Sequence, residues 1–262
     1  DENSSFLPGC AQAPKKIREV LHNGASNLYT ERGVNLEDES VFCDCGDLKF
    51  GKGQKGFDQI EAGIIRLKKK KAQILSIGGD HAITYPIIRG FSKTYSNLTV
   101  LHFDAHPDIY DEFEGNRISH ACPFARIMEE NLISRLIQVG IRSTTDHIQQ
   151  QYSKFGIEVI EARDFKPDLD LNLTGPLYIS LDLDVLDPAF TPGISHHEPG
   201  GLSVRDVLTI IQSINVPIVG ADVVEYNPTR DISDMTAMVA VKFVKELAGK
   251  MISQNLLGNT KY

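Results

Sequence analysis

The stretch TVLHFDAHPD, residues 99–108, joins a short apolar run to three side chains of the metal-ligand type. Residues 99–103 have the β-branched and aromatic composition of a buried strand. Asp104, His106 and Asp108 follow at every second position, so an extended chain places them on the same side. Ligands of open parallel sheets bind beyond the carboxyl ends of the strands. We therefore expect a functional site where this strand ends.

Further runs of the same kind lie on both sides of this stretch. Short apolar runs predict buried strands at residues 74–77, 136–139, 177–181 and 216–219. After an irregular start, amphipathic stretches predict helices at residues 56–71, 82–95, 121–130, 204–214 and 233–252. This alternation is typical of a parallel sheet with helices on both faces. We expect one three-layer α/β/α domain over residues 1–262, with a mostly parallel sheet. Because Asp1 stands where an initiator methionine would, we expect the extreme N-terminus to be missing.

The composition excludes several classes of function. No run approaches the roughly 18 apolar residues that a membrane span needs, so we expect no membrane partner. The net charge of −8 argues against nucleic acid, because phosphate binding calls for a basic face. The 4 cysteines form neither a Cys-x-x-Cys pair nor a dense framework, which is typical of reduced thiols in an intracellular protein.

Two more strand ends carry acids and histidines. Gly78-Gly79-Asp80-His81 follows the run at 74–77, and Asp182-Leu183-Asp184 follows the run at 177–181. A single Asp-x-His or Asp-x-Asp motif is more often a solvated turn. Here both motifs follow strands, and His81 follows a Gly-Gly turn after a third, so all three point ligand-type side chains at one sheet edge. The candidate metal ligands are His81, Asp104, His106, Asp108, Asp182 and Asp184.

The chemistry of these six residues favours two divalent cations over a structural zinc. The set has no thiolate, and its four carboxylates balance the charge of two such ions. Oxygen-rich ligands with some imidazole favour manganese. Paired ions about 3.5–4 Å apart lower the pKa of a bridging water, so hydrolysis is the expected reaction class.

Four motifs make the pattern more specific: GGDHAI at 78–83, DAHPD at 104–108, SLDLDVLDP at 180–188 and DVVEYNP at 222–228. Together they resemble the ureohydrolases, the family of arginases and agmatinases. The similarity runs in order along nearly the whole chain, from about residue 3 to residue 252. SHHEPGG at 195–201 and DIYDEFEGNRISHA at 108–121 are most similar to the plant-type arginases.

The resemblance implies the family's single α/β/α domain and a site with two Mn²⁺ ions. One ion would be held by His81, Asp104, Asp108 and Asp182, and the other by Asp104, His106, Asp182 and Asp184. The catalytic set would be His120, Glu225 and Asp108. His120 matches the histidine that moves a proton to the leaving amine, and Glu225 matches the carboxylate that binds the guanidinium.

The resemblance implies hydrolysis of a small guanidino compound, with L-arginine as the preferred substrate, giving L-ornithine and urea. The alternatives are agmatine, giving putrescine and urea, and another guanidino acid. An α-carboxylate needs donors at the mouth of the site, for which Asn116, Ser119 and His196 are the candidates. His102 is expected to point to the opposite face of its strand and to be structural.

Two other functions remain open at this level. One is a single-zinc deacetylase of related architecture, which also uses an Asp-x-His pair. The other is a non-catalytic scaffold, which would keep the fold after the site has lost its activity. The family implies a homo-oligomer, either a trimer or a hexamer. A plant-type enzyme is expected in mitochondria or plastids, and a bacterial relative in the cytoplasm.

Overall fold

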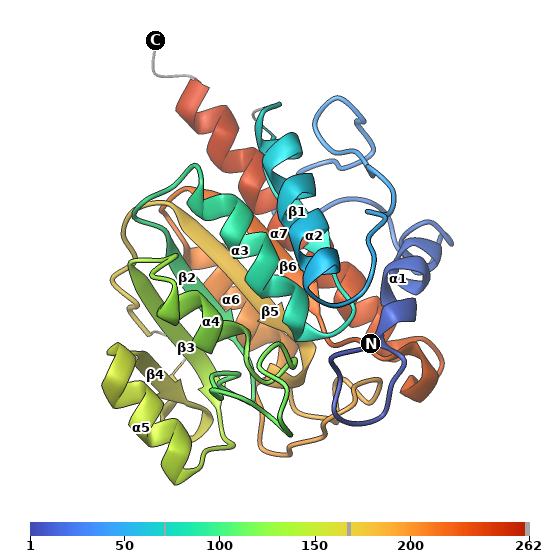
Figure 1. Ribbon diagram of the computed structural model, residues 1–262. Helices are drawn as coiled ribbons and strands as arrows, with labels where there is room; N and C mark the ends of the chain where they lie inside the picture. The colour runs from blue at the N-terminus through green and yellow to red at the C-terminus, as the bar shows by residue number, and fades with distance from the viewer. Residues whose placement is uncertain (71, 167–168, 260–262) are drawn as a thin grey trace.

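A six-stranded sheet runs through the middle of the computed structural model, which describes residues 1–70, 72–166 and 169–259 (Figure 1). The strand order is β1-β6-β5-β2-β3-β4. The strands are β1 (Ile74–Ile77), β2 (Thr99–Phe103), β3 (Arg135–Ile141), β4 (Glu158–Glu161), β5 (Leu177–Asp182) and β6 (Ile218–Val224). Every pairing between these described strands is parallel. The predicted fold class is confirmed.

Helices cover both faces of the sheet (Figure 1). One face packs against α2 (Gly53–Lys68), α3 (Thr84–Ser92) and α4 (Pro123–Glu129). The other packs against α1 (Ala13–Leu21), α6 (Val204–Ser213) and α7 (Met235–Asn259). Helix α5 (Asp146–Phe155) precedes the edge strand β4. Within the described part of the chain, no helix is long and apolar enough to cross a membrane.

Strand β2 lies between two hydrophobic cores, and all of its residues are buried. Leu101 and Phe103 join the core that includes residues of α1, α6 and α7, whereas Val100 joins the core on the α2, α3 and α4 side. Successive side chains of a strand point to opposite faces, so a strand covered on both sides is apolar at most positions.

A row of polar residues nevertheless crosses the sheet near the strand ends. Gln138, His102, Ser180 and Asp222 occupy neighbouring register positions on β3, β2, β5 and β6, and each is 0% exposed. These four residues are the polar row. Buried polar groups are costly unless they are hydrogen-bonded, so each residue of the row needs hydrogen-bonding partners inside the protein.

Most predicted elements appear at or near their predicted positions. Strands at 74–77 and 99–103 match β1 and β2, and the runs at 136–139 and 177–181 lie within β3 and β5. The strand predicted at 216–219 was misplaced, because Pro217 precedes β6 and the strand continues through Gly220 and Asp222 to Val224. Strand β4 and helix α5 were not predicted.

The helices differ from the prediction mainly at the start of the chain. The irregular start was wrong, since α1 forms there with a proline in its first turn and buries Ile17 and Val20. The helix predicted at 56–71 is α2, which ends at Lys68, and Lys71 lies outside the described residues. The four remaining predicted helices correspond to α3, α4, α6 and α7.

Candidate metal centre

The six predicted metal ligands come together at the carboxyl ends of β1, β2 and β5. His81, Asp104, Asp108 and Asp182 form one buried group whose ligand atoms lie within 4.8 Å of one another. Asp104, His106 and Asp184 form a second such group. Asp104 belongs to both, as a carboxylate between two ions would. Asp182 belongs to the first group but not to the second.

Short-range hydrogen bonds shape the loops that carry these ligands. The Asp104 carboxylate accepts from the backbone nitrogen of His106 at 2.6 Å, and the Asp182 carboxylate accepts from that of Asp184 at 2.8 Å. Such bonds bend the chain sharply just after a strand. Asp108 has a φ of 47°, a left-handed conformation that costs free energy in a residue with a side chain. The tight loops therefore hold the carboxylates in place.

The His81 ring is enclosed by acids on one side and by a hydroxyl on the other. Its Nδ1 lies 3.2 Å from Asp104, 3.1 Å from Asp108 and 3.1 Å from Asp182. Its Nε2 lies 2.9 Å from the Ser180 hydroxyl, which donates its hydrogen to Asp222 at 2.7 Å.

The Ser180 contact assigns a tautomer to neutral His81. Because Ser180 gives its one hydrogen to Asp222, it must accept at His81, so the ring carries a hydrogen on Nε2. Nδ1 then has the lone pair and faces three carboxylates. Such a cluster is unfavourable without a positive charge at its centre, and a divalent cation satisfies all four groups. The donor set therefore fits a metal ion.

Electrostatics leads to the same conclusion. Burial lowers the pKa of His81, but the carboxylates of Asp104, Asp108 and Asp182 outweigh it and raise the pKa well above its usual value. The carboxylates thus favour a positive charge at His81 Nδ1, which a bound metal cation would supply in place of a proton. Burial and the neighbouring Asp104 carboxylate raise the pKa of Asp184 to about 6, against the opposing effect of His106. The second group is likewise short of positive charge.

His102 does not point away from the site, and the prediction that it would was wrong. Its Nε2 lies 2.8 Å from a carboxylate oxygen of Asp104. Residues two positions apart along a strand share a face, so His102 lies on the same side as Asp104. By distance alone, His81, His102 and Asp104 form a third group that could hold a cation.

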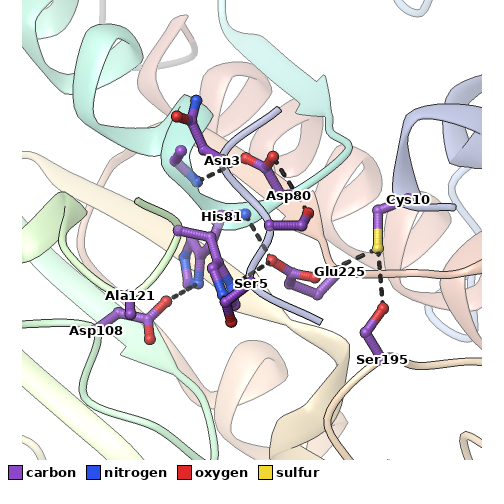
Figure 2. Close-up of polar contacts among 12 residues, drawn as sticks. Asn3, Ser5, Cys10, Asp80, His81, Asp108, Ala121, Ser195 and Glu225 are labelled. Carbon is purple, nitrogen blue, oxygen red and sulfur yellow. Dashed lines mark hydrogen bonds and ion pairs between the residues drawn. The ribbon is translucent and has the colours of Figure 1, made fainter. Parts of the chain in front are cut away.

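Glu225 lies beside His81, at the edge of this cluster (Figure 2), and contacts the His120 ring. One Glu225 oxygen, Oε1, accepts from the backbone nitrogen of His81 at 2.8 Å and lies 3.3 Å from His120 Nδ1. The other, Oε2, accepts from the Cys10 thiol at 3.3 Å. Glu225 also has a φ of 62°, in the left-handed region. Backbone strain of this kind is common at functional sites.

The two side chains form a buried ion pair. Burial lowers the pKa of His120, but the Glu225 carboxylate raises it to about 9. Burial raises the pKa of Glu225, but His120 and the His81 backbone N–H lower it below its usual value. At neutral pH the pair therefore consists of an imidazolium and a carboxylate.

The three predicted substrate-tail residues lie around His120. Ser119 is buried next to it in the chain, and the His196 ring lies 5.1 Å from the His120 ring and 5.9 Å from that of His106. Asn116 and Ser119 both donate to Asn3, at 3.3 Å and 3.4 Å. Part of their hydrogen-bonding capacity is thus taken up within the protein.

The sequence reasoning missed the contribution of residues 3–10. The Ser5 hydroxyl lies 2.8 Å from His120 Nε2, and the Asn3 carbonyl accepts from the His120 backbone nitrogen at 3.0 Å. Cys10 contacts Glu225, as Figure 2 shows. The signal available was the polar Asn3-Ser4-Ser5 run within the stretch that resembles the family. No periodicity pointed to it.

Comparison with known proteins gives a consistent result. The sequence matches the arginase family over residues 1–249. It is 47% identical to arginase 2, chloroplastic/mitochondrial, of Arabidopsis thaliana, over 95% of this chain and 77% of that protein. The solved arginase from Medicago truncatula superposes with a TM-score of 0.90 at 44% identity, over 95% of this chain and 84% of that one. An agmatinase of Bacillus cereus is 34% identical, over 94% and 87%. The resemblance predicted from the four motifs is confirmed.

Proposed function

The chain belongs to the arginase family, and we propose that it hydrolyses L-arginine to L-ornithine and urea at a dimanganese centre. The observation that carries this proposal is the arrangement of two groups. The His81 ring nitrogen faces three carboxylates, and the His120–Glu225 ion pair lies directly beside them. The first group suits a metal ion, and the second suits a guanidinium cation.

We assign the ligands as the family resemblance implies. His81, Asp104, Asp108 and Asp182 would hold one ion, and Asp104, His106, Asp182 and Asp184 would hold the other. The oxygen-rich set supports manganese as the metal. When bound, the two cations would activate water for attack on an electrophilic carbon near neutral pH. The remaining steps depend on the side chains of this chain.

Glu225 would bind and orient the substrate. Its two oxygens offer a planar acceptor pair that matches the N–H fork of a guanidinium. Both oxygens are held by the protein itself, through the His81 backbone nitrogen and the Cys10 thiol. Glu225 is 5% exposed, so little water competes for its carboxylate. Asp108, held in its left-handed conformation, would fix the position of the first metal group relative to this carboxylate.

His120 would supply the proton that the leaving amine needs. Its pKa near 9 keeps the proton on the ring at neutral pH while Glu225 is close. A guanidinium bound to Glu225 competes for the same carboxylate and places a second cation beside the imidazolium. Both effects make His120 a stronger acid at the moment when the amine departs.

Arginine is preferred over agmatine because the chain is more similar to plant arginases than to agmatinases. The Arabidopsis thaliana arginase is 47% identical and the Bacillus cereus agmatinase 34%, over almost the same share of the chain. Arginine differs from agmatine by an α-carboxylate, which Asn116, Ser119 and His196 would bind at the mouth of the site. His196, between the rings of His106 and His120, is suitably placed to donate.

Initial rates of urea release from arginine, agmatine and guanidinobutyrate, each with Mn²⁺ supplied, test the proposal. We expect arginine to give the highest kcat/KM. An enzyme that prefers agmatine would overturn the substrate assignment and leave the reaction class intact. Urea from none of the three would overturn the function.

Two further properties rest on the family and the relatives. We propose a trimer or hexamer, which sedimentation of the full chain tests. The names of the plant relatives support a mitochondrial or plastid location, which fractionation of the source cells tests.

A further inference from the structure

The polar row divides into two halves, and each half contacts a different candidate metal ligand, His81 or Asp104. Asp222 and Ser180 contact each other, and Ser180 contacts His81. Gln138 and His102 contact each other, and His102 contacts Asp104. The first half determines which His81 nitrogen faces the carboxylates. The second half has no counterpart in the proposed function, because His102 is neither a predicted ligand nor a substrate contact.

The orientation of the Gln138 amide is fixed by its surroundings. Its nitrogen donates to the Pro107 carbonyl at 2.7 Å and lies 3.0 Å from His102 Nδ1. A carbonyl oxygen can only accept, so the amide nitrogen must be at this end. The reversed amide would place two carbonyl oxygens against each other. Both Gln138 N–H groups are therefore used, one for Pro107 and one for His102.

The fixed amide determines the tautomer of His102. Because Nδ1 accepts from Gln138, it carries the lone pair, and the ring hydrogen of the neutral imidazole is on Nε2. That hydrogen points at Asp104 Oδ2, 2.8 Å away. No lone pair remains for a cation. The donor and acceptor inventory thus separates His102 from His81, although both lie close enough to Asp104 to form a metal-binding group.

The surroundings of His102 leave little room for another arrangement. The ring is 0% exposed, and its centroid lies 4.1 Å from that of Phe124 on α4. Asp104 is held at both ends, since Oδ2 accepts from His102 and Oδ1 accepts from the His106 backbone nitrogen at 2.6 Å. This is the carboxylate that belongs to both ligand groups.

We propose that His102 is a positioning residue of the metal centre: Gln138 locks its neutral Nε2–H tautomer, and that hydrogen orients the Asp104 carboxylate toward the two metal groups. The inference rests on the proposed metal centre, and it adds two residues that the ligand set does not include. Hydrogen bonds from outside the ligand shell commonly set the affinity of a metal site.

The tautomer can be measured directly by ¹⁵N NMR of the histidine rings in the whole 262-residue chain without metal. We expect His102 to have a bare Nδ1 and a protonated Nε2, and to keep the Nε2 hydrogen when Zn²⁺, a diamagnetic cation, is added. Loss of that hydrogen on adding Zn²⁺ would make His102 a ligand and overturn the proposal. A hydrogen on Nδ1 would do the same.

Metal affinity gives a second readout by titration calorimetry with Mn²⁺. His102→Phe and Gln138→Leu should each weaken binding, by about 10- to 100-fold for the loss of the Asp104 donor. His102→Gln offers an amide donor and should recover most of the affinity. The matched controls are His147→Phe, a ring stacked on Tyr110, and Gln151→Leu, a buried glutamine that donates to Asp111. Both should bind Mn²⁺ like the wild type.

These outcomes separate the inference from the proposed function. If His102→Phe binds Mn²⁺ as tightly as the wild type, the positioning role is wrong, whatever the enzyme hydrolyses. If the tautomer and affinities are as expected but no urea is released from arginine, the proposed function is wrong and the positioning role stands. A variant that fails to fold leaves the NMR result on the wild-type chain to decide.

Discussion

His120 and Glu225 form a buried ion pair in which Nδ1 lies 3.3 Å from Oε1. The residues are 105 positions apart in sequence, and each also contacts the N-terminal stretch, through Ser5 and Cys10. The pair places an acid and an anion beside the metal groups.

Replacing His120 with asparagine should remove the proton donor while leaving substrate binding largely in place. We expect kcat for arginine to fall by about 10²- to 10⁴-fold, with a smaller change in KM. Steady-state kinetics measures the split. His197→Asn is the control, because His197 is exposed and its Nε2 pairs with the Pro192 carbonyl at 2.9 Å. A His120→Asn enzyme with near-normal kcat would remove His120 from the mechanism.

Replacing Glu225 with glutamine should destabilise the transition state, because the bound guanidinium then lacks its buried counter-charge. A loss of about 2–5 kcal/mol corresponds to a decrease in kcat/KM of at least about 30-fold. Glu158→Gln, in an exposed pair with Arg135, should leave kcat/KM unchanged.

The same substitution makes a prediction about the titration of His120. The Glu225 carboxylate raises the pKa of His120 to about 9, so Glu225→Gln should lower the pKa of His120. In the wild type, the raised pKa adds stability that is fully present below the unfolded pKa and is lost as pH rises through about 9. NMR titration of the His120 ring reports the shift, and an unchanged midpoint would contradict the ion pair.

Removal of the metal should expose repulsion within the second ligand group. Asp184 has a pKa raised to about 6, so its ionisation destabilises the metal-free fold. This cost begins above the unfolded pKa of about 4 and is complete above about 6. Asp184→Asn should therefore unfold at a higher temperature than the metal-free wild type at pH 7, and the difference should shrink as pH falls through 6.

With Mn²⁺ present the order should reverse. A ligand at a hundredfold excess over its Kd stabilises the wild type by about 2.7 kcal/mol per site, and Asp184→Asn should gain less. Asp164→Asn, at an exposed position, should follow the wild type in both conditions. Thermal unfolding with and without a chelator measures all three chains. An Asp184→Asn chain that is less stable than the wild type without metal would count against the repulsion.

The Ser180 hydroxyl should matter for metal binding although it is not a ligand. Ser180→Ala removes the acceptor for His81 Nε2–H and the donor to Asp222. The neutral His81 ring can then adopt the other tautomer, with its hydrogen on Nδ1 facing the carboxylates. We expect Mn²⁺ affinity to fall by about 10- to 100-fold. Ser213→Ala is the control, because Ser213 is an exposed residue whose hydroxyl donates to the Ile210 carbonyl. Equal affinities in the two variants would exclude a role for Ser180.

The sequence predicted the buried strands well because their composition reflects burial on both faces. Strand β4 escaped notice since it is an edge strand that begins and ends with Glu158 and Glu161. Helix α5 was missed because it is polar and buries little apart from Ile148 and Gln151. In β6, Gly220 and Asp222 interrupt the apolar run, and only the three-dimensional partners of Asp222 explain a carboxylate inside a sheet.

The site was predictable where spacing along a strand determines geometry. The end of β2 shows this, since the parallel order of the strands brings Asp104 and the loop that follows it to the ligand edge of the sheet. The positions of His106 and Asp108 depend on the sharp bend after the strand and on the left-handed Asp108, which alternation along a strand does not predict. Alternation should, however, have placed His102 beside Asp104. The contacts of Ser5 and Cys10 were not predictable, because they join residues 115 and 215 positions apart. The tautomers of His81 and His102 depend on Ser180 and Gln138, whose roles become visible only once the strands are in register.

Titration of the metal-free chain with Mn²⁺, followed by urea release from L-arginine, tests the central claim most directly. Activity should rise until two equivalents of Mn²⁺ are bound per chain and then stay constant. One tightly bound zinc per chain with no activation by Mn²⁺, or no urea at any Mn²⁺ concentration, would contradict a dimanganese arginase.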